Sequence, residues 1–138
     1  MTEPQHDRSD LLTGGELLAA ISTTVVRVVA DYTGRGPTRA RTFINGDWIF
    51  VAVQDGLTKG ERKLIAIGRD DFVLATRKTF QSAMREELSR EVETLTGRTV
   101  IAFLSDNHVD PDIGLEAMLL APDRSPPHGD GDHYPQPA

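Results

Sequence analysis

Three arginines within a short segment, Arg35, Arg39 and Arg41, are the clearest candidates for chemistry in this chain. They lie in the sequence GRGPTRAR at residues 34–41, in which glycines allow close approach of the backbone and a proline limits flexibility. Planar guanidinium groups bind carboxylate, phosphate or bicarbonate through paired hydrogen bonds. We expect the three groups to converge on an anion or an acidic surface. The alternative is that they form ion pairs within the domain or with a second subunit.

A second candidate is the acidic segment that contains Asp106, His108, Asp110 and Asp112. Carboxylates bind hard cations, and an imidazole has a pKa suited to general acid or base catalysis. The spacing does not match an EF-hand, because proline and alanine stand where that loop needs glycine and glutamate. A two-histidine zinc site is also excluded, since the other histidines fall in the predicted tails. The alternative is a structural loop whose polar side chains bond to nearby backbone.

Familiar catalytic patterns are missing from the sequence. The chain has no cysteine, Ser105 is not in a Gly-x-Ser-x-Gly motif, and no glycine-rich phosphate loop follows a predicted strand. The sequence therefore favours a non-enzymatic domain over an enzyme, and it predicts neither a cofactor nor a metal site. If catalysis occurs, His108 is the candidate acid or base.

The candidate residues are positioned by seven predicted elements in the order α-β-β-α-α-β-β. Apolar spacing and turn signals place them at residues 14–33, 42–44, 48–53, 58–67, 72–96, 99–104 and 113–120. This order predicts an α+β domain with a four-stranded, mainly antiparallel sheet that is covered on one face by helices.

Local signals predict how the helices begin and end. Thr13 and Thr58 are each followed three residues later by glutamate, which is the pattern of a capping box. Asp70 or Asp71 is expected to cap the long helix, and a glycine directly after the first and the last helix predicts a left-handed stop. The charged side of the long helix, which includes Arg77, is typical of a solvated surface.

Turn and strand signals complete the prediction. Asn45 and Gly46 form the strongest hairpin signal, because a type I′ turn needs positive φ at both central residues. The strand at 48–53 is apolar on both faces, which indicates a central, covered position in the sheet. The connection at 105–112 is longer than most hairpin loops.

Composition indicates one domain at residues 13–121 between tails at 1–12 and 122–138 that we expect to be disordered. The net charge is -6, and each tail holds one arginine against three acidic residues, so much of the acidity lies outside the domain. No apolar run is long enough to span a membrane and no signal peptide is visible. We expect a soluble, cytoplasmic protein.

The chain is similar to the MpsC-type domain family, a bacterial family previously known as a domain of unknown function. The resemblance covers residues 15–120, and its matching segments are residues 34–41, 55–58, 103–106 and 110–112. It implies a component of a sodium-translocating, membrane-potential-generating system whose membrane partners are linked to inorganic carbon uptake. Gly60 in the second capping box and the proline-rich acidic tail depart from typical members.

Three functions are compatible with these observations. The first is a non-enzymatic accessory or regulatory domain that forms a homodimer and has a membrane-protein partner, as the resemblance implies. The second is an anion- or cation-binding domain or an enzyme that uses the 35–41 turn and the 106–112 loop together. The third is RNA binding of the KH type, which the element order permits but which Asp70 and Asp71 disfavour, because they stand where a Gly-x-x-Gly loop would clamp phosphates.

Overall fold

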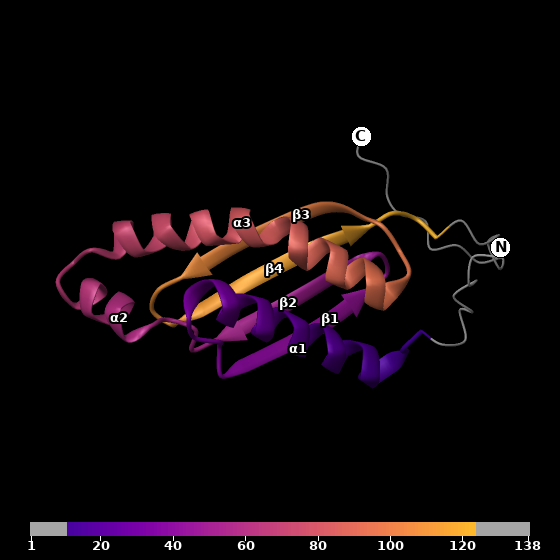
Figure 1. Cartoon of the computed structure of the whole chain (residues 1–138), viewed down its shortest axis with the longest axis horizontal. Coiled ribbons are helices and arrows are strands. Elements are labelled where there is room, and N and C mark those ends of the chain that lie inside the picture. The colour runs from indigo at the N-terminus through magenta and orange to yellow at the C-terminus, as the bar shows by residue number, and fades with distance from the viewer. Residues whose placement is uncertain (1–10, 124–138) are drawn as a thin grey trace.

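The computed structural model describes residues 11–123 and confirms the predicted α+β fold (Figure 1). Most of the two tails that we expected to be disordered lies outside the described residues. The elements follow in the predicted order, with bounds α1 Gly14–Thr33, β1 Arg39–Asn45, β2 Trp48–Gln54, α2 Lys59–Ala66, α3 Asp70–Thr96, β3 Val100–His108 and β4 Ile113–Leu120. No helix in this described part has the length and apolar character needed to cross a membrane.

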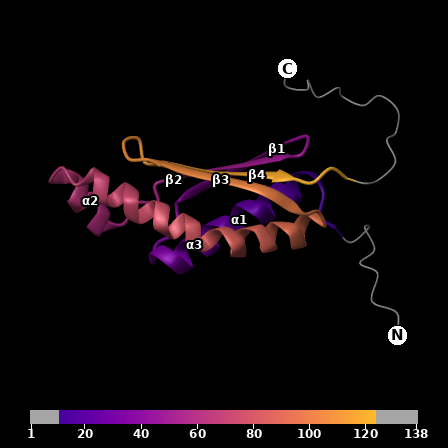
Figure 2. The same cartoon turned by 90° about the horizontal axis from the view of Figure 1, so that it is seen from above.

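The sheet has the strand order β1-β2-β4-β3, and each neighbouring pair is antiparallel. β2 and β4 therefore occupy the centre, and β1 and β3 form the edges. The central position of β2 was predicted from its apolar residues. The cover of the sheet on one face was also predicted, since α1 and α3 lie on one face only and Figure 2 shows the opposite face without a helix.

The hydrophobic core lies between α1, α3 and the covered face of the sheet (Figure 2). Each fully buried aliphatic side chain contributes about 1.5–3 kcal/mol to folding. Most of the β-branched residues that weaken the helix propensity of α1 are buried, so packing holds this helix in place, as predicted. The buried core residues are Ile21, Val25, Val28, Val29, Ile49, Val51, Met84, Leu88, Val92, Phe103, Met118 and Leu120.

The helix ends agree with the sequence signals in part. Thr58 forms the predicted capping box with Glu61, whereas the Thr13 side chain makes no capping hydrogen bond to another described residue. α3 begins at Asp70, so this aspartate lies in the first turn and does not cap the helix. Glycines in the left-handed conformation end α1 and α3, as predicted.

The hairpin between β1 and β2 forms where it was predicted, but its turn differs from the prediction. Asn45 pairs with Trp48, so the two central residues are Gly46 and Asp47. Gly46 has a φ of 60°, and Asp55 is the sole described non-glycine residue with positive φ. Positive φ at the first central residue alone is typical of a type II′ turn, because glycine is required only at that position.

The strand β3 is longer than the sequence predicted. Residues 105–108 continue its pairing with β4, so that Ser105 lies opposite Glu116 and His108 opposite Ile113. The expected long loop is therefore a connection of residues 109–112. The last four residues of β3 are polar on both faces of the strand. The sequence therefore lacked the apolar pattern that predicts a strand, and we interpreted these residues as a loop.

Candidate functional site

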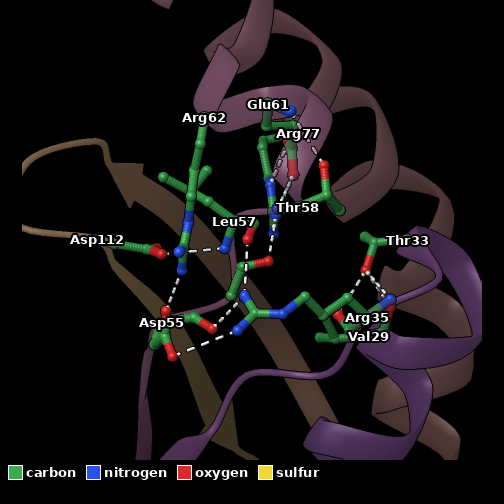
Figure 3. Close-up of polar contacts among 11 residues, drawn as sticks. Val29, Thr33, Arg35, Asp55, Leu57, Thr58, Glu61, Arg62, Arg77 and Asp112 are labelled. Atoms are coloured by element: carbon green, nitrogen blue, oxygen red, sulfur yellow. Dashed lines mark hydrogen bonds and ion pairs between the residues drawn. The ribbon is translucent and has the colours of Figure 1, made fainter. Parts of the chain in front are cut away.

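Arg35 points from the turn after α1 toward the segment of residues 55–57. Its Nη1 donates hydrogen bonds to the backbone oxygens of Asp55 at 2.8 Å and Leu57 at 2.7 Å. Its Nη2 lies 3.3 Å from the Asp55 carboxylate, and Figure 3 shows the guanidinium facing the 55–57 segment. The planar fork of arginine suits this arrangement, because it donates to several oxygens at once.

Asp55 belongs to a cluster of polar side chains around residues 55–57 and lies on the exposed side of that cluster. Its backbone has a φ of 58°. Its carboxylate accepts a hydrogen bond from Thr38 at 3.0 Å and forms an ion pair with Arg62. The hydrogen bond from Thr38 lowers the pKa of Asp55, and the charges of Arg35 and Arg62 lower it further against the effect of burial. The polar contacts of Asp55 thus hold the start of the β2–α2 connection.

Arg77 forms the buried side of the same cluster and is 8% exposed. Its Nε donates to Glu61 at 2.8 Å, and its Nη2 donates to the backbone oxygen of Gly56 at 2.6 Å (Figure 3). Burial raises the pKa of Glu61, but hydrogen bonds from Arg77 and Thr58 outweigh it and hold that pKa below its ordinary value. The expectation that Arg77 lies on a solvated surface was wrong.

The acidic segment reaches this cluster through one residue. The Asp112 carboxylate accepts a hydrogen bond from the Leu57 backbone N–H at 3.0 Å, and its backbone oxygen accepts one from Asp55 at 3.1 Å. Arg35, Arg77 and Asp112 therefore hold the 55–57 segment from three sides. The cavity beside Gly56, Arg77 and Asp112 has a volume of about 20 Å³, which is room for about one water molecule. This cluster holds the fold together and leaves no space for a larger ligand.

Arg39 and Arg41 lie on the face of the sheet that carries no helix. They are two residues apart on β1, so both side chains point to the same face. The Arg41 guanidinium lies 5.1 Å from the centre of the Phe43 ring. Together with Ala52 and Gln54 they line an open hollow of about 710 Å³. The expected convergence of three guanidinium groups was wrong, because Arg35 is separated from this pair and committed to backbone oxygens.

Asp106 and His108 lie on the same open face but at its other edge, on β3. Cross-strand pairing places Arg41, Ala52, Leu115 and Asp106 in one row. Three strand spacings separate the ends of this row by about 14 Å. The Nδ1 atom of His108 lies 2.9 Å from the backbone oxygen of Pro111, to which it donates when protonated.

Asp110 is exposed in the connection between β3 and β4. Within residues 11–123, no group of three or more His, Asp or Glu side chains is arranged to hold a metal ion. Arg39 and Arg41 therefore do not meet the acidic residues in a single site within one chain. Of the predicted site residues, only Arg35 and Asp112 contact the same segment, residues 55–57, and both form hydrogen bonds with its backbone.

The open sheet face is apolar at its centre. We define it by the residues whose side chains point away from the helices: Arg39, Arg41, Phe43, Trp48, Phe50, Leu104, Asp106, His108, Ile113, Leu115 and Leu119. The exposed fractions of Leu104, Phe43 and Leu115 are 62%, 46% and 43%. The rings of Trp48 and Phe50 are stacked with centroids 5.8 Å apart. Contiguous apolar surface of this kind marks interaction sites in proteins.

The sequence contained the signal for this face in the apolar residues on both sides of β2 and β4. We interpreted the pattern in β2 as a central, covered position in the sheet. Since α1 and α3 cover only one face of the sheet, the second face keeps exposed apolar side chains.

Glu116 is a buried carboxyl group that the sequence reasoning did not single out. It is 3% exposed on the covered face of β4, and it accepts a hydrogen bond from Ser105 on the adjacent strand. Burial raises the pKa of Glu116 to about 7, although hydrogen bonds with Ser105 and Gln81 act in the opposite direction. Burial thus favours the neutral form of this carboxyl group inside the core.

A family model described as "Na+-translocating membrane potential-generating system (MpsC)" matches residues 13–122. The match extends from the start of α1 to the end of β4 and includes every element described above. No curated protein and no solved structure matched the chain in the corresponding comparisons.

Proposed function

Because this chain belongs to the MpsC family, we propose that it is a soluble, cytoplasmic accessory or regulatory domain of a sodium-translocating, membrane-potential-generating system. It has no enzymatic role of its own and acts by binding other protein chains, among them a membrane component of the system. The open sheet face is the surface on which this assembly depends.

The observation that carries this proposal is the contrast between the polar cluster and the open sheet face. The polar side chains around residues 55–57 are bonded to one another and to backbone, and the cavity beside them has room for about one water molecule. The open face instead presents aromatic and aliphatic side chains to solvent. Aromatic residues and arginine are enriched in protein interfaces, and both are present here.

The alternative is an ion-binding domain or an enzyme in which the arginines and the acidic segment work together. The separation of about 14 Å between the edges of the sheet argues against it. The hollow beside Arg39 and Arg41 is the feature that favours it, since it offers two guanidinium groups to an anion. RNA binding has less support, because Asp70 and Asp71 lie in the first turn of α3, next to the connection that would have to hold phosphates.

The test is complementation of a strain that lacks this gene, with the sodium-dependent membrane potential measured by a potential-sensitive dye. We expect Leu104→Glu to fail, because it places a charge on the open sheet face at a side chain that is already 62% exposed. We expect Asp110→Asn, in the acidic segment but outside this face, to restore the potential in full. Lys63→Glu on the exposed side of α2 is the matched control for a change of charge.

The opposite result would contradict the proposal. If Asp110→Asn abolishes the potential while Leu104→Glu restores it, the acidic segment carries the function and the enzyme or ion-binding alternative gains. Affinity purification of the wild-type chain and of Leu104→Glu from detergent-solubilised membranes adds a direct readout. The membrane component should be recovered with the wild type and depleted with the variant.

A further inference from the structure

The cross-strand register orders the open sheet face into rows that run from β1 to β3. One row is Arg41, Ala52, Leu115 and Asp106, and its two ends have opposite charge. The next row begins with Phe43 on β1 and ends with Leu104 on β3. The face therefore carries Arg39 and Arg41 along one edge and Asp106 at the other, and it is apolar between them.

We infer that the open sheet face binds a second copy of this chain, with a two-fold axis that runs parallel to the strands between β2 and β4. This inference rests on the proposed function, because it names the partner of the same surface. A rotation about such an axis places β1 of one copy over β3 of the other and keeps each row at its own height. Arg41 then lies opposite Asp106 of the second copy, and the pair occurs twice in the dimer.

The apolar rows agree with this arrangement. The same rotation places Phe43 opposite Leu104 and Trp48 opposite Leu119, so that each large ring meets an aliphatic side chain. Packed sheets lie about 10 Å apart with strands about 30° from parallel, which shifts the edge rows by about one residue. The length of an arginine side chain accommodates this shift, so the charged pairs remain within reach.

Charge complementarity selects a second copy over other occupants. A two-fold axis across the strands would place β1 over β1, and the arginines would lie opposite Asn45 and Phe43 without an acidic partner. An anionic lipid surface would attract the arginine edge but repel Asp106 at the other edge. A surface with opposite charges at its two edges and an apolar centre is complementary to itself.

The experiment is a charge exchange, measured by sedimentation equilibrium of the purified chain. The wild type should be a dimer at micromolar concentration. Arg41→Glu and Asp106→Arg should each weaken the dimer about tenfold or more, because each brings two pairs of like charges together. The double variant Arg41→Glu/Asp106→Arg should recover most of the wild-type affinity, since the reversed pairs attract again. Lys63→Glu, outside the interface, should leave the affinity unchanged.

Rescue by the double variant is the decisive result. The two residues lie on opposite edges of one chain, so a rescue reports contact between copies rather than contact within one. A wild-type monomer, or single variants that weaken the dimer without rescue in the double variant, would overturn this dimer. Circular dichroism of each variant distinguishes lost association from lost folding.

The result is independent of the complementation test. A monomeric wild type together with failed complementation by Leu104→Glu would refute the dimer and leave the proposed function in place with another occupant. A dimer with successful rescue, together with full complementation by Leu104→Glu, would refute the proposed use of this face and support the dimer.

Discussion

The buried carboxyl group of Glu116 makes the stability of this protein depend on pH in a way that one substitution removes. Folding raises the pKa of Glu116 from its ordinary value of 4.5 to about 7 because burial disfavours the charged form. The native state therefore holds the proton more tightly than the unfolded state does. The resulting stabilisation is fully present below about pH 4.5 and is lost as the pH rises to about 7.

The substitution Glu116→Gln fixes this side chain in a neutral form and keeps a side-chain oxygen that accepts from Ser105. A tenfold change in proton affinity corresponds to about 1.4 kcal/mol, so the rise from 4.5 to about 7 corresponds to about 3 kcal/mol. We expect Glu116→Gln to match the wild type near pH 4 and to exceed its free energy of unfolding by about 3 kcal/mol at and above pH 8.

The assay is urea unfolding followed by circular dichroism at several pH values for both proteins. Other groups, such as Asp55 and Glu61, titrate in both proteins alike, so the difference between them isolates Glu116. Glu86→Gln is the matched control, because its side chain is 78% exposed, and its effect should remain small at every pH. A difference between Glu116→Gln and wild type that does not change with pH would refute the reasoning.

Three further predictions concern the polar cluster, and each is measured by urea unfolding at neutral pH. Arg77→Met should lower the free energy of unfolding by about 3–5 kcal/mol, because it leaves the carboxylate of Glu61 buried without its partner. The double variant Arg77→Met/Glu61→Gln should lower it by less than the sum of the two single changes. Arg35→Lys should lower it by about 1–3 kcal/mol, since one ammonium group does not reproduce the fork that bonds two backbone oxygens, whereas Arg39→Lys should have little effect. Thr58→Ala should lower it by about 0.5–2 kcal/mol through loss of the capping box, whereas Thr13→Ala should not, because Thr13 makes no such bond to the described residues.

Much of the fold could be predicted because its signals are local. The β-branched stripe of α1, the hairpin at Gly46 and the glycine stops after α1 and α3 each depend on neighbours in sequence. The type of the hairpin turn was mispredicted, since register decides which two residues are central. Register is set by packing across the whole sheet, and a dipeptide does not carry that information.

The candidate site was harder to predict because its contacts are distant in sequence. Arg77 follows Val73 by one helical turn and precedes Gln81 by another, so its position in the buried stripe was visible in the spacing. Its charge led us to place it on the surface. Only the 55–57 segment, which brings acceptors to meet it, explains why an arginine is buried there. The charge of Arg77 indicated an exposed position and its helical spacing indicated a buried one, and the structure agrees with the spacing.

The order of the strands also determines when each part of the sheet can form during synthesis. β1 and β2 are adjacent in sequence, as are β3 and β4, so each hairpin closes a short loop. The central pairing of β2 with β4 joins residues as far apart as Trp48 and Leu119, and it has to wait for α2, α3 and β3. Until β4 leaves the ribosome, β2 has one unpaired edge and an apolar surface on both sides. The nascent chain is therefore most exposed to misassociation during the interval in which its long helix is being made.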